Sequence, residues 1–170
     1  MINVDKEVNA VIDILTEEYG CYSDLAELSK SKKDIIIAGK VAELDKMVKL
    51  EQDMIFSIGQ LERKREEAVS KLCKALDMNS DRMTINELAK VIKPELKNKL
   101  EDIQSKLQKT LSELKAANDV NGQLIEQSLE YIDYSINLIA GSGMETGSLY
   151  EDIGKNKSKQ GKKNIIDTKI

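Results

Sequence analysis

The sequence of 170 residues predicts an all-α fold: an elongated antiparallel helical hairpin with a third long helix packed along it. Good helix formers dominate the composition, aromatic residues make up 4%, and there is one proline. Apolar residues also recur every three or four positions along three long segments, which is the spacing of one helix face. We therefore expect a coiled-coil-like bundle of three long helices and one short helix. It would occupy residues 1–148, with residues 149–170 as a flexible tail.

The first predicted helix runs from about Val4 to Ala38, and Gly39 directly after it is typical of a helix C-terminus. Its apolar stripe consists of Val4, Val8, Val11, Leu15, Tyr22 and Leu25. The second predicted helix runs from about Val41 to Leu76. Because the connection between the two helices is so short, we expect them to form an antiparallel hairpin.

Folding the chain at Gly39 would bring Gly20 and Gly59 to the same height in the hairpin. Glycine destabilises a helix interior by about 1 kcal/mol relative to alanine, so a shared position would need a reason. The pair therefore predicts either a close approach of the two helices or room for a large side chain from the third helix. A chance placement of the two glycines is the alternative.

A short helix and the last long helix follow a polar loop. Thr84 and Glu87 have the spacing of a capping box, which predicts a short helix from there to Val91 or Ile92. Pro94 suits the first turn of the last helix, which we expect to reach Ala140. Its seam alternates steps of four and three through Leu107, Leu111, Leu114, Asn118, Asn121, Ile125, Ser128, Ile132, Ser135 and Ile139.

Polar residues on this seam have two interpretations. Asn118, Asn121, Ser128 and Ser135 could fix the register of the last helix against the hairpin, as a core asparagine does in coiled coils. Alternatively, this half of the helix is a partly open groove whose asparagines bind a partner. Both interpretations remain open at the level of the sequence.

The composition argues against catalysis and against several classes of partner. The chain has no histidine, only two distant cysteines, Cys21 and Cys73, and no glycine-rich phosphate loop, so we expect no enzyme, cofactor or metal. The net charge is −4 with intermixed signs, which does not favour nucleic-acid binding. Without a signal peptide or an apolar run long enough to span a bilayer, the chain is expected to be cytoplasmic and not inserted in a membrane.

One stretch resembles a known family. Asn118, Asn121, Leu124-Ile125 and Ser128-Leu129 follow the order Asn-x-x-Asn-x-x-Leu-Ile-x-x-Ser-Leu, which is similar to the signature of FlgN-type flagellar export chaperones. The resemblance extends from residue 1 to about residue 150. It implies a chaperone that binds hook–filament junction proteins and escorts them to the export gate of the flagellar type III apparatus.

The resemblance also implies functional residues. The client's terminal helix would lie in a groove, the helix-in-groove mode of recognition. The expected client-binding residues are Asn118, Asn121, Leu124, Ile125, Ser128, Leu129, Ile132 and Ile136. Tyr150 near the chain end would contact the export gate.

Two other functions compete with this expectation. The chain could be a structural or oligomerising coiled-coil module without a secreted client. A membrane-surface helix recruited by the basic tail is the weaker alternative. The oligomeric state stays open, a weak homodimer included.

Overall fold

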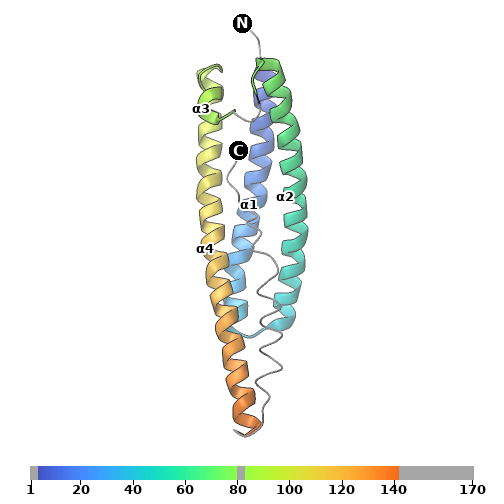
Figure 1. The fold of residues 1–170 in the computed structure, drawn as a ribbon, viewed down its shortest axis with the longest axis vertical. Helices are drawn as coiled ribbons and strands as arrows, with labels where there is room; N and C mark the ends of the chain where they lie inside the picture. The colour runs from blue at the N-terminus through green and yellow to red at the C-terminus, as the bar shows by residue number, and fades with distance from the viewer. Residues whose placement is uncertain (1–3, 80–82, 142–170) are drawn as a thin grey trace. The chain divides into compact units, whose positions relative to one another are not determined.

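The computed structural model describes residues 4–79 and 83–141, which form four helices and, within these ranges, no strand. The helices are α1 (Asp5–Ile37), α2 (Val41–Leu76), α3 (Ile85–Leu88) and α4 (Pro94–Ile139), as Figure 1 shows. The predicted all-α class is therefore confirmed. The bounds of the three long helices agree with the sequence prediction to within one residue at each end.

The chain divides into two units, the first ending at Leu124 and the second beginning at Ile125. Helix α4 contributes residues to both units. The described part of the second unit is the end of α4 with the two residues that follow it. The predicted boundary at residue 148 and the predicted tail lie outside the described residues.

Helix α1 ends before Gly39, as the sequence predicted. Gly39 has a φ of +67°, in the left-handed region that favours glycine. The Lys40 N–H donates to the carbonyl oxygen of Ile35 at 3.2 Å, and the Gly39 N–H donates to that of Ile36 at 3.1 Å. This pair of bonds is the Schellman motif, which satisfies carbonyls left over at a helix C-terminus.

The capping box before α3 is also present. Thr84 Oγ1 accepts a hydrogen bond from the Glu87 N–H at 3.2 Å, and Glu87 Oε2 accepts one from the Thr84 N–H at 3.4 Å. The helix itself is shorter than expected, because it ends at Leu88 instead of residue 91 or 92. After Leu88 the N–H groups of Lys90 and Val91 bond to carbonyls three residues back, so the chain tightens into turns before Pro94.

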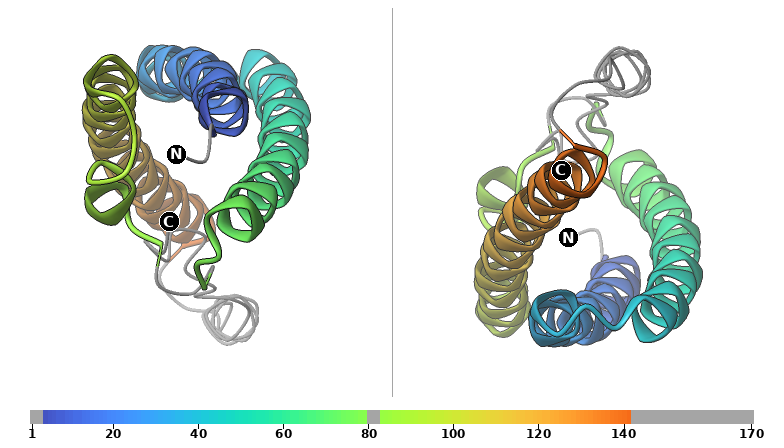
Figure 2. Two further views of the ribbon diagram at one scale, coloured as in Figure 1. Left: turned by 90° about the horizontal axis from the view of Figure 1, so that it is seen from above. Right: turned by 90° about the horizontal axis from the view of Figure 1, so that it is seen from below.

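Within the first unit, α1 lies beside both other long helices (Figure 2). It is antiparallel to α2, since Arg65 pairs with Glu18 at 3.1 Å and Lys32 pairs with Glu51 at 2.8 Å. It is parallel to α4, since Lys93, just before α4, pairs with Asp5 at the start of α1. Near the other end of the unit, Ser29 bonds to α4, as described below. The predicted hairpin is thus confirmed, and the third helix packs along α1.

The register of the hairpin differs from the sequence prediction. Glu18 with Arg65, Tyr22 with Glu62 and Lys32 with Glu51 have residue numbers that add up to 83 or 84, not 79. The connection between the helices therefore offsets α2 by about one helical turn. Gly20 and Gly59 are not paired, and a Cβ atom added to either would meet nothing within 4 Å. The expected close approach of the helices and the alternative, a large side chain of the third helix at these glycines, were therefore both wrong.

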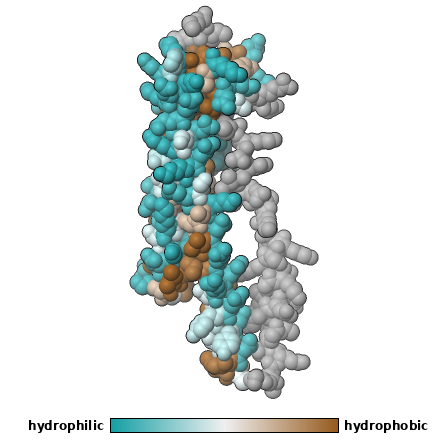
Figure 3. All heavy atoms as spheres, turned by 90° about the vertical axis from the view of Figure 1, so that its left-hand side faces the viewer, coloured by the Kyte–Doolittle hydropathy of each residue, from teal (hydrophilic) through white to brown (hydrophobic). Residues whose placement is uncertain are grey.

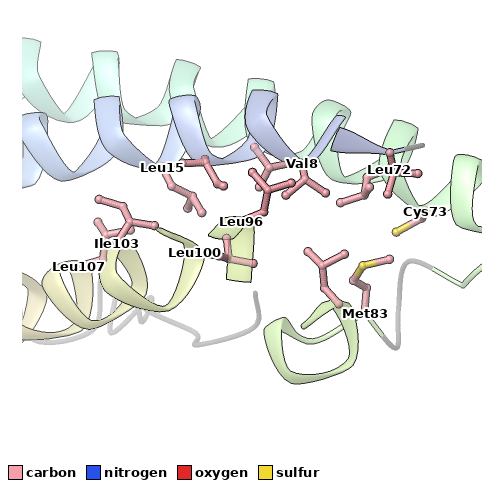
Figure 4. Packing of buried hydrophobic residues seen from close by; sticks show 13 residues of the cluster. Val8, Leu15, Leu72, Cys73, Met83, Leu96, Leu100, Ile103 and Leu107 are labelled. Atoms are coloured by element: carbon pink, nitrogen blue, oxygen red, sulfur yellow. The ribbon is translucent and has the colours of Figure 1, made fainter. Parts of the chain in front are cut away.

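The main core forms where α1, α2, α3 and α4 converge near the start of the chain. In Figure 4, Val8 and Leu15 of α1 point towards Leu100 and Ile103 of α4, with Leu72 and Cys73 of α2 and Met83 nearby. A smaller cluster farther along joins Leu25, Ala26, Ile58 and Leu114. The face in Figure 3 is largely hydrophilic, with apolar side chains gathered in a few places. This is the distribution expected of amphipathic helices.

The first half of α2 contributes little to these cores. The side chains of residues 41–57 are all half-buried or exposed, although Val48 and Ile55 belong to the apolar pattern of this helix. The buried residues of α2 are Ile58, Leu61, Leu72 and Cys73.

Candidate functional site

A polar network joins α1 to α4 inside the first unit. The Ser29 hydroxyl donates to Asn118 Oδ1 at 2.6 Å. Asn121 Nδ2 donates to the carbonyl oxygen of Ser29 at 2.7 Å and lies 3.4 Å from the Ser29 hydroxyl oxygen. Ser29 is fully buried and Asn121 is 4% exposed, whereas Asn118 is exposed. The two asparagines of the seam therefore converge on one buried serine.

This network acts as a register device. Because Ser29 bonds to both Asn118 and Asn121, a shift of α4 by one turn along α1 would replace one of the two asparagines with an apolar seam residue, Leu114 or Ile125. A buried polar group without a partner costs about 1–3 kcal/mol, so the shifted packing is disfavoured. Ser29 is thus the partner that the register interpretation of Asn118 and Asn121 requires. Their part in client binding stays a prediction.

A pocket of about 350 Å³ lies beside the network, between α1 and α4. Its α4 wall includes Ala116, Ala117, Val120 and Asn121. Charged residues of both helices form the rim. The lining residues are Ser29, Lys30, Lys33, Glu113, Ala116, Ala117, Val120 and Asn121.

In the second unit, the end of α4 presents apolar side chains to solvent. Ile125, Leu129, Ile132 and Ile136 are between 41% and 57% exposed. Their spacing of four, three and four residues places them on one face of the helix. Leu124, the last residue of the first unit, is half-buried and Ser128 is exposed. The predicted gate residue, Tyr150, lies outside the described residues.

A second exposed apolar set on the same helix was not among the expected site residues. Tyr131, Tyr134 and Leu138 are each more than 60% exposed. At 100° per residue they lie on a different side of α4 from Ile132 and Ile136. The sequence contains a signal for them, because their spacing of three and four residues continues a stripe that begins at Val120 and Leu124.

A buried acidic residue links α1 to α2. Glu18 is 1% exposed; its Oε2 accepts a hydrogen bond from Arg65, and its Oε1 has no partner among the described residues. Burial raises the pKa of Glu18 above 4.5, the nearby Arg65 lowers it, and Glu62 raises it further. Glu62 in turn accepts a hydrogen bond from the Tyr22 hydroxyl at 3.1 Å.

Glu18 and Ser29 are two of the buried polar residues that sequence reasoning missed. Both occupy positions where the four-three alternation of α1 continues, Glu18 between Leu15 and Tyr22 and Ser29 after Leu25. A polar residue at such a position was the available signal. It did not reveal which residue of another helix would be the partner.

The described residues show neither a metal-binding group nor a membrane-spanning helix. Residues 4–79 and 83–141 contain no group of three or more His, Cys, Asp or Glu side chains arranged to hold a metal ion. None of the helices in those ranges is long and apolar enough to cross a membrane.

Comparisons with known proteins identify the family. The chain matches the family described as FlgN protein over residues 1–158. It is 29% identical over 130 residues to the protein YvyG of Bacillus subtilis (strain 168), which is described as uncharacterized; the match covers 76% of this chain and 79% of YvyG. The comparison with solved structures gave no significant match. Because the family match spans nearly the whole chain, this protein belongs to the FlgN family of flagellar export chaperones.

Proposed function

We propose that this chain binds hook–filament junction proteins in the cytoplasm, prevents their premature assembly and escorts them to the flagellar export gate. The chain binds and releases its client without catalysing a reaction and without a cofactor. The client element is a terminal helical segment of the junction protein. Membership of the FlgN family supports the chaperone role, and the exposed face of α4 supports its location.

The observation that carries the proposal is the apolar face formed by Ile125, Leu129, Ile132 and Ile136 in the second unit. These side chains remain 41% to 57% exposed. Contiguous exposed apolar residues on a helix mark an interaction site more often than isolated ones do. Their helical spacing fits an amphipathic client helix, whose apolar side chains would bury this face.

The roles of the other predicted residues follow from their positions. Leu124 directly precedes the apolar face on the same helix, and Ser128 lies between Ile125 and Leu129 in the sequence. Asn118 is exposed and already accepts a hydrogen bond from Ser29, so its second lone pair can accept one from a client. Asn121 is buried beside the pocket between α1 and α4.

Binding should be moderate in strength. A client segment that orders as it binds loses several kcal/mol of the interaction energy to conformational entropy. The same cost allows release when the export apparatus takes over the client. A chaperone that bound irreversibly would block export.

A titration tests the proposal. The purified chain is titrated calorimetrically with each hook–filament junction protein of the same bacterium, and the control is the same junction protein without its terminal helical segment. We expect a complex with the intact client and none with the truncated one. Absence of binding to every junction protein would refute the proposed function.

The role of Tyr150 requires a separate measurement. Replacing Tyr150 with alanine should leave client affinity unchanged and lower the amount of junction protein exported by living cells. Phe in place of Tyr150 would show whether the hydroxyl is needed. A loss of client affinity in the alanine variant would assign Tyr150 to the client site instead.

The competing function, a self-associating coiled coil without a client, would use the same exposed face. A second copy of the chain could bury Ile132 and Ile136 as well as a client helix does. Light scattering over a range of concentrations distinguishes the two functions. A tight dimer that does not dissociate when a junction protein is added would favour the structural module.

A further inference from the structure

We propose that the pocket between α1 and α4 is a second client subsite, which takes a hydrogen-bond-donating side chain from a client segment that also carries an acidic residue. The inference rests on the proposed function and adds to it a site in the first unit. The subsite is formed by Asn121, Ala116, Ala117, Val120 and Lys33.

One acceptor of the network has no donor. Asn121 Oδ1 is buried and has no hydrogen-bond partner among the described residues. The amide orientation is fixed, because the carbonyl oxygen of Ser29, 2.7 Å from Nδ2, can only accept a hydrogen bond. The one proton of the Ser29 hydroxyl is already donated to Asn118. The donor for Asn121 Oδ1 must therefore come from outside the network.

The pocket leaves space next to Asn121. The pocket has a volume of about 350 Å³ and is walled on the α4 side by Ala116, Ala117 and Val120. Small side chains at these positions leave room that larger residues would fill. The space can admit the end of a partner's side chain, such as an amide or a hydroxyl. Its N–H or O–H would bond to Asn121 Oδ1 after a local shift of the neighbouring side chains that cover this buried atom. An apolar side chain would leave the acceptor unsatisfied.

The two lysines at the rim of the pocket differ in their ion pairs. Lys30 is paired with Glu113 at 3.2 Å and with Glu27 at 3.4 Å. Lys33 is exposed, and no salt bridge of Lys33 is found among the described residues. Lys33 is thus the rim cation whose charge is not already paired with a carboxylate among the described residues. An acidic side chain on the client is the complementary group.

Two substitutions test the subsite by independent routes. Ala117→Leu fills the pocket without altering Asn121, and Ala10→Leu makes the same change at an exposed position of α1 as a control. Lys33→Glu reverses the unpaired charge at the rim, and Lys46→Glu makes the same change on the exposed surface of α2. Each variant is titrated calorimetrically with the intact junction protein at two salt concentrations, and its helix content is checked by circular dichroism.

We expect Ala117→Leu and Lys33→Glu each to lower affinity by about tenfold, the loss for Lys33→Glu being larger at low salt. The two controls should bind like the wild-type chain. If the wild type binds a junction protein and both pocket variants bind it equally well, the pocket holds only water and the inference is wrong while the proposed function stands. If the wild type binds no junction protein, the proposed function fails and this inference with it.

Discussion

Asn121 of α4 donates a hydrogen bond of 2.7 Å to the main-chain oxygen of Ser29 in α1, inside the interface of the two helices. The two residues are 92 positions apart in the sequence. The bond fixes how far α4 is displaced along α1, and the Ser29 hydroxyl reinforces it through Asn118. A bond that sets register need not add net stability, because an apolar pair of similar volume packs at least as well.

Asn121→Leu should therefore raise the free energy of unfolding, by about 1 kcal/mol. Leucine removes the unsatisfied Oδ1, and the Ser29 carbonyl lies within α1, where its helical hydrogen bond remains available. Chemical denaturation measures the change. Gln123→Leu is the matched control and should change stability less, since Gln123 is exposed and lies outside the Ser29 network. A clear loss of stability in the Asn121 variant would show that the bond stabilises the fold as well as aligning it.

Glu18 makes stability depend on pH. Because burial raises its pKa in the folded chain above 4.5, the folded state holds the proton more tightly than the unfolded state does. The free energy of unfolding should thus fall as pH rises from 4.5 through the folded pKa. Glu18→Gln should remove this contribution, so the variant's stability should change less over that range. Thermal unfolding at a series of pH values checks it; an unchanged pH profile would contradict the role of Glu18.

At neutral pH, Arg65→Met should lower the free energy of unfolding more than Glu18→Gln does. It leaves the Glu18 carboxylate buried without its cationic partner, at a cost of about 3 kcal/mol. Glu18→Gln instead leaves Arg65 with part of its side chain exposed, where water can solvate the guanidinium. The destabilisation by Arg65→Met should shrink as pH falls towards 4.5, because Glu18 then becomes neutral. Urea denaturation at two pH values measures both effects. If the destabilisation by Arg65→Met were the same at both pH values, the buried charge of Glu18 would not be its cause.

Ile132→Asp should weaken client binding by about 2 kcal/mol, since the apolar side chain would be buried only in the complex. The isolated chain should be nearly as stable as the wild type, because Ile132 is 50% exposed there. Tyr134→Asp is the control: Tyr134 is also exposed and apolar, but lies on another side of α4. Calorimetric titration with a junction protein gives both affinities. A larger loss for Tyr134→Asp would move the client surface to the tyrosine side.

Thr84→Ala should destabilise the chain by about 1 kcal/mol, because it removes the acceptor of the Glu87 N–H at the start of α3. Thr84→Ser keeps that acceptor and should be close to neutral. Since Leu88 of α3 and Met83 belong to the main core, fraying of this turn should lower global stability, not only local order. Thermal melts of the two variants test this, and equal melting temperatures would contradict it.

Much of the fold followed from local patterns. The end of α1 at Gly39, the Thr84 cap and the start of α4 at Pro94 were all predicted from residues within one turn of the helix ends. Such ends depend on hydrogen bonds between neighbours in the chain, so the sequence contains the information directly. The FlgN family that the resemblance of the Asn118–Leu129 stretch suggested was likewise confirmed by the family match over residues 1–158.

The candidate site was predictable only in part. The seam of α4 was clear from its spacing, but the same spacing includes Asn121, which is buried against Ser29, and Ile132, which is half exposed. Periodicity shows which side chains share a face and does not show how much of that face another helix covers. The pairing of Gly20 with Gly59 failed for a related reason, because the short connection offset α2 along α1.

By itself, the sequence determined four helices, the ends of the three long ones to within one residue, the apolar seam of α4 and the family. Only the tertiary structure decided that Ser29 is the partner of both asparagines, that Glu18 is buried beside Arg65 and that the hairpin is offset by about one turn. A helix is specified by contacts three and four residues apart, which one segment contains. The neighbours of a buried side chain depend on the axial offset and rotation of separate helices, and these are fixed only when all their packing and hydrogen-bonding requirements are met together.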